Sequence, residues 1–180
     1  MGFFTLWGDA MRRTSSLAIS IATLTLALVL GGCAMLVPET PLPGESRAAV
    51  IAKRGPPTAV YPDPPGEVLE YRTGPMGQYT WMAHMGPDGR LISFEQVLTG
   101  EKFATIKIDK ANKNDVLRTI GQPAETSYLP LKDYEVWSYR YKEAGVWNSM
   151  MHVHFDRAGI VRMMQNGPDP MYDDRRRSFW

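Results

Sequence analysis

The sequence predicts an α+β protein made of two tandem copies of one unit, a short helix followed by a three-stranded antiparallel meander. The first observation is internal similarity, because residues 46–57 align with residues 112–123 at a constant offset of 66 positions. The second is that both stretches run from a good N-cap residue to a glycine and a proline. The third is that alternating apolar and polar residues, the period of a β-strand, follow each stretch.

Each copy begins with a predicted helix of about two turns. Ser46 and Asn112 are favourable N-cap residues, and Asp115 stands where it can complete a capping box with Asn112. Gly55 and Gly121 stand where a helix needs a left-handed terminating residue, and the prolines at 57 and 123 prevent its continuation.

The strands are clearest in the second copy. Trp137, Tyr139 and Tyr141 alternate with polar residues, so they share one face of a strand and are expected in the core. A second strand covers Met151–Phe155, and a turn at 156–159 leads to a third strand at 160–164. The first copy repeats this pattern more loosely, with strands at 69–71, 79–85 and 91–94 and a turn at 86–89.

Three segments of the second copy, 112–123, 137–139 and 153–161, resemble the SmpA/OmlA (BamE-like) family of outer-membrane lipoproteins. The resemblance covers most of residues 103–165, and residues 46–98 look like a degenerate second copy. It implies a pair of helices packed on a three-stranded meander and a role in the barrel-assembly machinery. The best known protein of that family contains a single copy of the unit, whereas tandem copies of a similar unit occur in a secreted inhibitor of beta-lactamases. A periplasmic protein-binding or inhibitory module is therefore the alternative.

The N-terminus has the layout of a secretory signal. The basic pair Arg12-Arg13 precedes an apolar run of about 14 residues, which is short for a membrane span of roughly 20. The following Leu30-Gly31-Gly32-Cys33 resembles the lipobox of bacterial lipoproteins. This resemblance implies that residues 1–32 are a signal peptide and that Cys33 carries the lipid, with palmitate among its acyl chains. The start site stays open between Met1 and Met11, since Met11 gives a more compact charged head.

These signals divide the chain into five parts. They are a signal peptide at 1–32, a proline-rich, lipid-anchored linker at 33–45, the first copy at 46–98, the second copy at 99–167 and a disordered charged tail at 168–180. Ala34 follows the lipidated cysteine where an aspartate tends to retain enteric lipoproteins in the inner membrane. The expected location is thus the outer membrane, on its periplasmic face.

The sequence favours a non-enzymatic protein without a cofactor or metal. Cys33 is the single cysteine, and neither a nucleophile elbow nor a His-Glu-x-x-His motif is present. His152 and His154 share one strand face, with His84 at the position equivalent to His154, and two imidazoles at this spacing can share a metal ion. Because these histidines alternate with apolar residues, we expect them to be polar residues on the outer face of the sheet and not metal ligands. Basic and acidic side chains are balanced, so no nucleic-acid partner is implied.

The candidate partner-binding residues are Val146 and Trp147. They lie in a predicted hairpin loop at 143–148, where an apolar tip can contact an envelope protein or a bilayer. The alternative is that Trp147 folds back over the sheet edge. The equivalent loop of the first copy, 73–77, is shorter and built from turn residues, so only the second copy is expected to display a large apolar tip.

Overall fold

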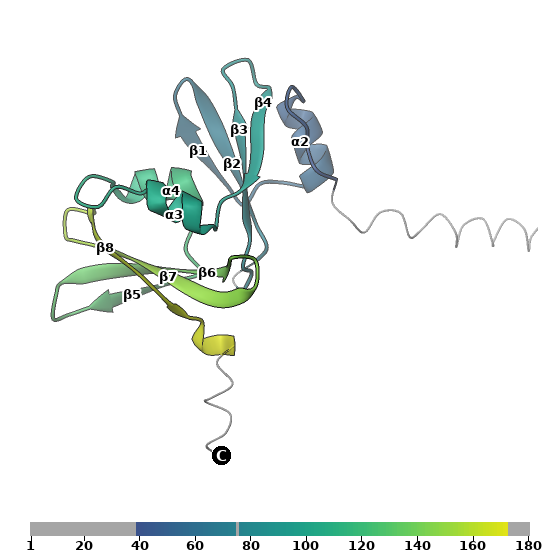
Figure 1. Ribbon diagram of the computed structural model, residues 1–180. Helices are drawn as coiled ribbons and strands as arrows, with labels where there is room; N and C mark the ends of the chain where they lie inside the picture. The colour runs from purple at the N-terminus through teal and green to yellow at the C-terminus, as the bar shows by residue number, and fades with distance from the viewer. Residues whose placement is uncertain (1–38, 75, 173–180) are drawn as a thin grey trace, which may run out of the picture. The chain divides into compact units, whose positions relative to one another are not determined.

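The computed structural model describes residues 39–74 and 76–172, and it confirms a mixed α+β structure. From Thr40 onward the described residues belong to one compact unit. Its first half contains α2 (Arg47–Arg54), β1 (Ala59–Asp63), β2 (Gly66–Arg72), β3 (Thr80–Met85) and β4 (Leu91–Gln96) (Figure 1). Its second half contains α3 (Gly100–Thr105), α4 (Lys113–Ile120), β5 (Glu125–Leu129), β6 (Tyr134–Glu143), β7 (Trp147–Phe155), β8 (Val161–Pro168) and the 3₁₀ turn η2 (Pro170–Tyr172).

The two predicted helices, α2 and α4, form with the predicted caps. The Ser46 hydroxyl accepts a hydrogen bond from the Ala49 N–H, and Asn112 forms a complete capping box with Asp115. Gly55 and Gly121 end the helices with φ of 80° and 81°. Their ψ values of −173° and −163° place them outside the left-handed helical region, in an extended conformation that is essentially restricted to glycine.

Each half forms a four-stranded antiparallel sheet, so the predicted three-stranded meander was one strand short in both halves. The strand orders are β1-β2-β3-β4 and β5-β6-β7-β8. The additional strands, β1 and β5, lie at a sheet edge. β5 is exposed at all its positions, so it lacks the alternation of a half-buried strand, and β1 contains Pro62, a residue that sheets tolerate at an edge strand.

The two halves share details of local geometry. Ser46 forms an isolated antiparallel bridge with Arg90, and Asn112 forms the corresponding bridge with Ile160. The strand register shifts after His84 in the first half and after His154 in the second. In both halves, therefore, the residue that caps the helix is fixed to the end of the turn between the last two strands, and a bulge precedes that turn.

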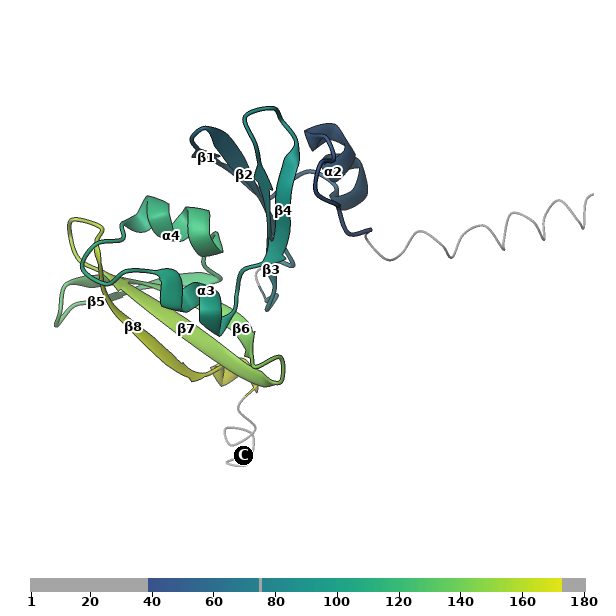
Figure 2. The same ribbon diagram turned by 45° about the horizontal axis from the view of Figure 1, so that its top comes forward.

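Separate apolar cores hold each helix to its sheet. In the first half Val50 of α2 packs among Leu69, Ala83 and Leu91. In the second half α3 and α4 lie on the same face of the β5–β8 sheet (Figures 1 and 2), and Phe103 of α3 meets the Tyr141 ring edge-on at a centroid distance of 4.9 Å. The residue pattern had located only α4. The family resemblance implied a pair of helices.

A buried polar cluster joins the two halves. Glu70 of β2 is fully buried, and its carboxylate accepts hydrogen bonds from the Tyr61 hydroxyl at 2.5 Å and from the Gln122 N–H at 3.1 Å. Tyr139 of β6 donates its hydroxyl to the Gly121 carbonyl at 3.0 Å. Burial raises the pKa of the Glu70 carboxyl. The end of α4 is thus fixed to the first sheet, and the halves share one structure.

The folded part extends beyond the predicted boundaries at both ends. The Gly44 N–H donates to the Leu91 carbonyl at 2.7 Å, and the Leu91 N–H donates to the Glu45 carbonyl at 2.8 Å, so the end of the predicted linker is bound to β4. Pro168 ends β8, and the buried Asp169 forms an ion pair with Arg140. The predicted disordered tail was therefore wrong for Pro168–Tyr172. Residues 173–180 lie outside the described part.

The signal peptide, Cys33 and the first part of the linker, up to residue 38, also lie outside the described residues, so the structure does not test the lipid-anchor prediction. Within residues 39–74 and 76–172, no helix has the length and apolar character needed to cross a membrane.

Candidate protein-docking surface

The β6–β7 hairpin ends in a tight turn that presents the predicted residues Val146 and Trp147. β6 ends at Glu143 and β7 begins at Trp147, which pairs with Glu143 in the strand register. The turn uses positive φ angles of 49° at Ala144 and 74° at Gly145. Trp147 is therefore the first residue of a strand, whereas the sequence placed it inside the loop.

Both apolar side chains at this tip face solvent. Trp147 is 70% exposed and Val146 is 66% exposed. Tryptophan is a large apolar residue, and in most folds it is well buried. The prediction of an exposed apolar tip is confirmed, and the alternative, in which Trp147 folds back over the sheet edge, is wrong.

Hydrogen bonds hold the base of the hairpin in place. The Glu143 carboxylate accepts from the Ser149 hydroxyl at 2.7 Å and from the Asn166 amide at 3.0 Å, and these bonds lower the pKa of Glu143. Asn148 accepts a hydrogen bond at 2.9 Å from Gln78, which lies in the β2–β3 loop of the first half. Three strands and the other half therefore support the backbone from which Trp147 projects.

A hollow of about 450 Å³ lies beside the hairpin. Residues 141–145 of the hairpin form one wall, and residues 99–101 at the start of α3 form the other. Trp147 and Tyr141 stand on the same face of the sheet, because antiparallel partners and alternate residues share a face. The exposed Trp147 of β7 therefore continues the row of aromatic side chains on β6, the row that α3 covers at Tyr141.

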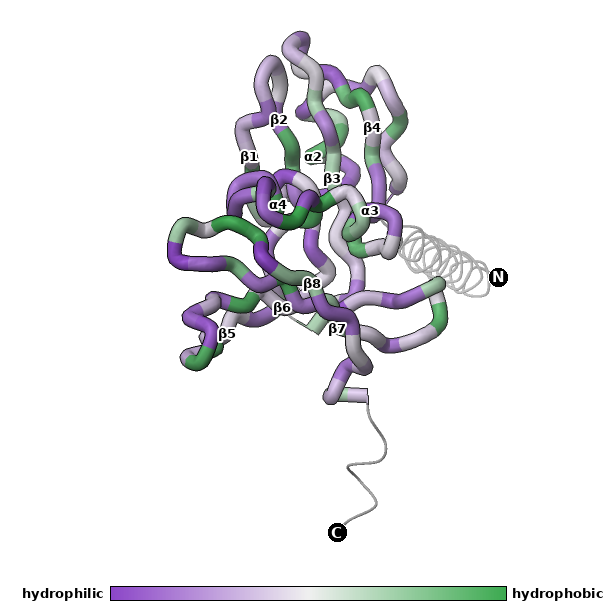
Figure 3. The backbone as a smooth tube through the Cα atoms, turned by 60° about the vertical axis from the view of Figure 1, so that its left-hand side comes forward, coloured by the Kyte–Doolittle hydropathy of each residue, from purple (hydrophilic) through white to green (hydrophobic). Residues whose placement is uncertain are grey.

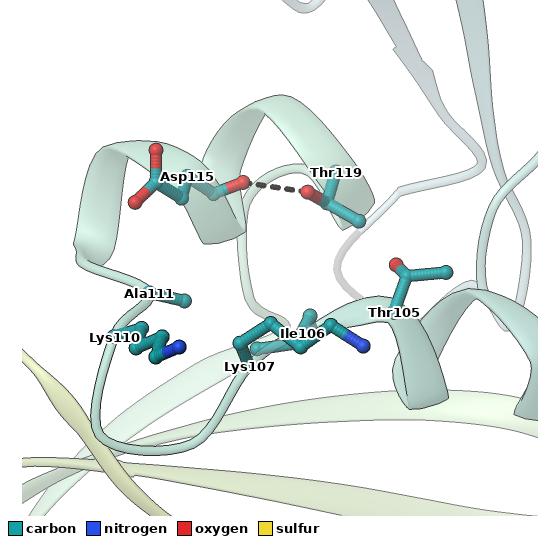
Figure 4. A pocket seen from close by; sticks show the side chains of 7 residues that line it. All are labelled: Thr105, Ile106, Lys107, Lys110, Ala111, Asp115 and Thr119. Carbon is teal, nitrogen blue, oxygen red and sulfur yellow. Dashed lines mark hydrogen bonds between the residues drawn. The ribbon is translucent and has the colours of Figure 1, made fainter.

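A second hollow, of about 260 Å³, lies between α3 and α4 (Figure 4). Its charged lining residues are Lys107, Lys110 and Asp115. The Asp115 carboxylate already accepts from the Asn112 N–H at 2.9 Å and from Arg118 at 2.6 Å. The Asp115 side chain is thus engaged in capping α4.

The loop of the first half differs from the expectation. The sequence predicted a short turn at 73–77, but β2 ends at Arg72 and β3 begins at Thr80, so the loop is longer than its counterpart in the second half. Met76 is 55% exposed and Tyr79 is 42% exposed. The prediction that only the second half displays large apolar side chains in this loop was therefore wrong, although Trp147 remains the largest and most exposed of them.

The β5–β6 hairpin forms another apolar tip, which the sequence analysis did not predict. Leu131 is 99% exposed and Tyr128 is 58% exposed, and green apolar segments reach this end of the second sheet in Figure 3. The signal was present as Leu-Pro-Leu at 129–131. This signal predicts a hairpin tip only next to a predicted strand, and β5 lacks the alternation that predicts one.

The histidines occupy three different environments. His152 and Ser138 share a hydrogen bond of 2.8 Å, and His84 lies 3.4 Å from the Glu95 carboxylate. His154 lies on the sheet face opposite to the core residues Val153 and Phe155, as expected, but it is only 6% exposed. In the described part of the chain, no group of three or more histidines, cysteines, aspartates or glutamates is arranged to hold a metal ion.

No family model, no curated protein and no solved structure matches this chain. Any statement about its function therefore depends on its own residues and geometry.

Proposed function

We propose that this chain is a lipid-anchored, non-enzymatic envelope protein that acts through protein contacts in the assembly or maintenance of the outer membrane. The Leu30–Cys33 lipobox supports the anchor. In this proposal the mature protein begins at Cys33 and sits on the periplasmic face of the outer membrane.

The internal similarity supports a relationship to the SmpA/OmlA (BamE-like) family. Each half has a capped eight-residue helix, an antiparallel meander and a bulge before the last turn, in the same order. We interpret residues 46–98 and 99–167 as two copies of the BamE-like unit, each with one strand more than the resemblance implied. Barrel-assembly subunits are therefore the first partners to test.

The observation that carries the proposal is the exposed Trp147 on a hairpin whose base is held by hydrogen bonds. A tryptophan that is 70% exposed costs hydration free energy and contributes little to folding. Tryptophan is also among the residues most enriched in the energetic centres of protein interfaces. The hairpin with its adjoining hollow is thus a site where an envelope protein can bury the indole.

The tandem arrangement favours one alternative, a periplasmic inhibitory or binding module that captures a soluble protein. Affinity purification of the lipidated chain from membranes separates the two functions. Recovery of barrel-assembly subunits would support the proposal, recovery of a soluble periplasmic enzyme would support the alternative, and recovery of no specific protein would contradict both.

A further inference from the structure

The outer face of the second sheet carries three soft or borderline metal ligands side by side. His152 and His154 are alternate residues of β7, so they share a face, and that face is opposite to the one that carries Val153 and Phe155 in the core. Met163 of β8 pairs directly with His154 and therefore lies on the outer face as well. Side chains directly opposite each other have Cβ atoms about 4.5–5.5 Å apart, within reach of a shared ion.

His154 is buried without a hydrogen-bond partner. It is 6% exposed, and neither ring nitrogen bonds to any residue in the described part of the chain. A buried polar group without a partner is destabilising. An imidazole nitrogen with no protein partner, on a face that also presents a second imidazole and a thioether, points to an added ligand.

One ring nitrogen of His152 makes the kind of hydrogen bond that metal-binding histidines usually make. Its Nδ1 lies 2.8 Å from the Ser138 hydroxyl, so Nε2 is left to bind a ligand. Ligating histidines commonly use their other ring nitrogen for such a bond, which fixes the tautomer and the ring orientation. Burial lowers the pKa of both His152 and His154.

We propose that His152, His154 and Met163 form a binding site for a soft monovalent cation, Cu(I) or Ag(I). A thioether ligand selects soft ions, and the site has no carboxylate of its own to attract a hard divalent one. The nearby carboxylate of Glu125 lies 3.6 Å from Arg140 and pairs with it. Lys132 adds positive charge near His154, which penalises a divalent ion more than a monovalent one.

The first half lacks this arrangement although it has the same bulge. His84 is the residue before the register shift, as His154 is in the second half, but its partner across the strands is Ser93. The position two residues earlier is Met82, which lies in an apolar cluster. The site is thus specific to the second half, and His84 supplies a matched control.

The test is competition for Cu(I) between the full chain, purified in detergent, and the chromophoric chelator bicinchoninate under reducing conditions. The chain is alkylated beforehand so that no free Cys33 thiol competes. We expect one Cu(I) to be withdrawn per chain, His84→Ala to behave like wild type, and His154→Ala or Met163→Leu to weaken binding at least tenfold. In an NMR titration, Ag(I) should shift the imidazole ¹⁵N resonances of His152 and His154 and leave those of His84 unchanged.

Failure to withdraw Cu(I) would overturn the proposal. So would equal affinity for Zn(II) together with an unaffected Met163→Leu variant, because that pattern means a site built from nitrogen alone. Met163→Leu conserves side-chain volume, so it keeps the test decisive if His154→Ala unfolds the chain. The outcome is independent of any protein contact made by Trp147.

Discussion

The two glycines that end α2 and α4 should differ in their tolerance of a side chain. Both adopt a conformation with positive φ that costs a non-glycine residue about 1–3 kcal/mol. A Cβ at Gly55 would meet nothing within 4 Å, whereas a Cβ at Gly121 would lie 2.8 Å from the Glu70 carboxyl and 3.0 Å from the Met82 methyl. Forcing these groups apart adds an overpacking cost of about 1–3 kcal/mol.

Thermal unfolding followed by circular dichroism measures the difference. Taking roughly 3 °C per kcal/mol for a domain of this size, Gly55→Ala should lower the Tm by about 6 °C and Gly121→Ala by about 12 °C. Equal losses would show that the Glu70 cluster yields freely to an added methyl group. Unchanged melting in both variants would refute the backbone argument itself.

Three other predictions follow from the sequence and the packing. Cys33→Ser should abolish incorporation of labelled palmitate, because the thiol is the acyl acceptor in the proposed anchor, and equal labelling of both forms would end the anchor hypothesis. Trp137→Ala should cost roughly 3–5 kcal/mol of stability, since this indole is 8% exposed and packs on Phe155 at 4.7 Å, and urea unfolding with a smaller loss would place it outside the core. Glu70→Gln should flatten the pH dependence of stability: the folded pKa of Glu70 is raised, so its contribution is present below the unfolded pKa and is lost as the pH rises through the folded pKa. Denaturant midpoints from pH 4 to 8 that run parallel in both proteins would contradict this.

The parts of the fold that local signals specify could be predicted from the sequence. The helices α2 and α4 begin at cap residues and end at glycines, and both signals lie within a dozen residues. Trp137 and Tyr139 are in the core because alternation assigns a whole strand face at once.

The missed features depend on contacts between distant residues or have no periodic pattern. β5 is an edge strand exposed throughout, so burial leaves no trace in its sequence. The Glu70–Gln122 hydrogen bond joins residues 52 positions apart, and no local pattern reveals it. Met163 lies opposite His154 only because a bulge shifts the register of β8.

The exposure of Val146 and Trp147 was predicted because an apolar dipeptide next to Ala144-Gly145 marks a hairpin tip. The loop at 73–79 was predicted less well, because its length depends on where β3 begins. Glycine and proline in a segment favour a turn, but they do not determine how many residues separate the paired strands.

The most direct test of the proposed function is site-specific photo-crosslinking in intact cells, with a photoreactive phenylalanine analogue in place of Trp147. The same analogue in place of Tyr128, which is 58% exposed at the other hairpin, is the matched control. We expect a defined adduct with an outer-membrane assembly protein from position 147 and none from position 128. If position 147 gives no adduct, or if both positions give the same adducts in equal yield, Trp147 is not the anchor of a specific interface.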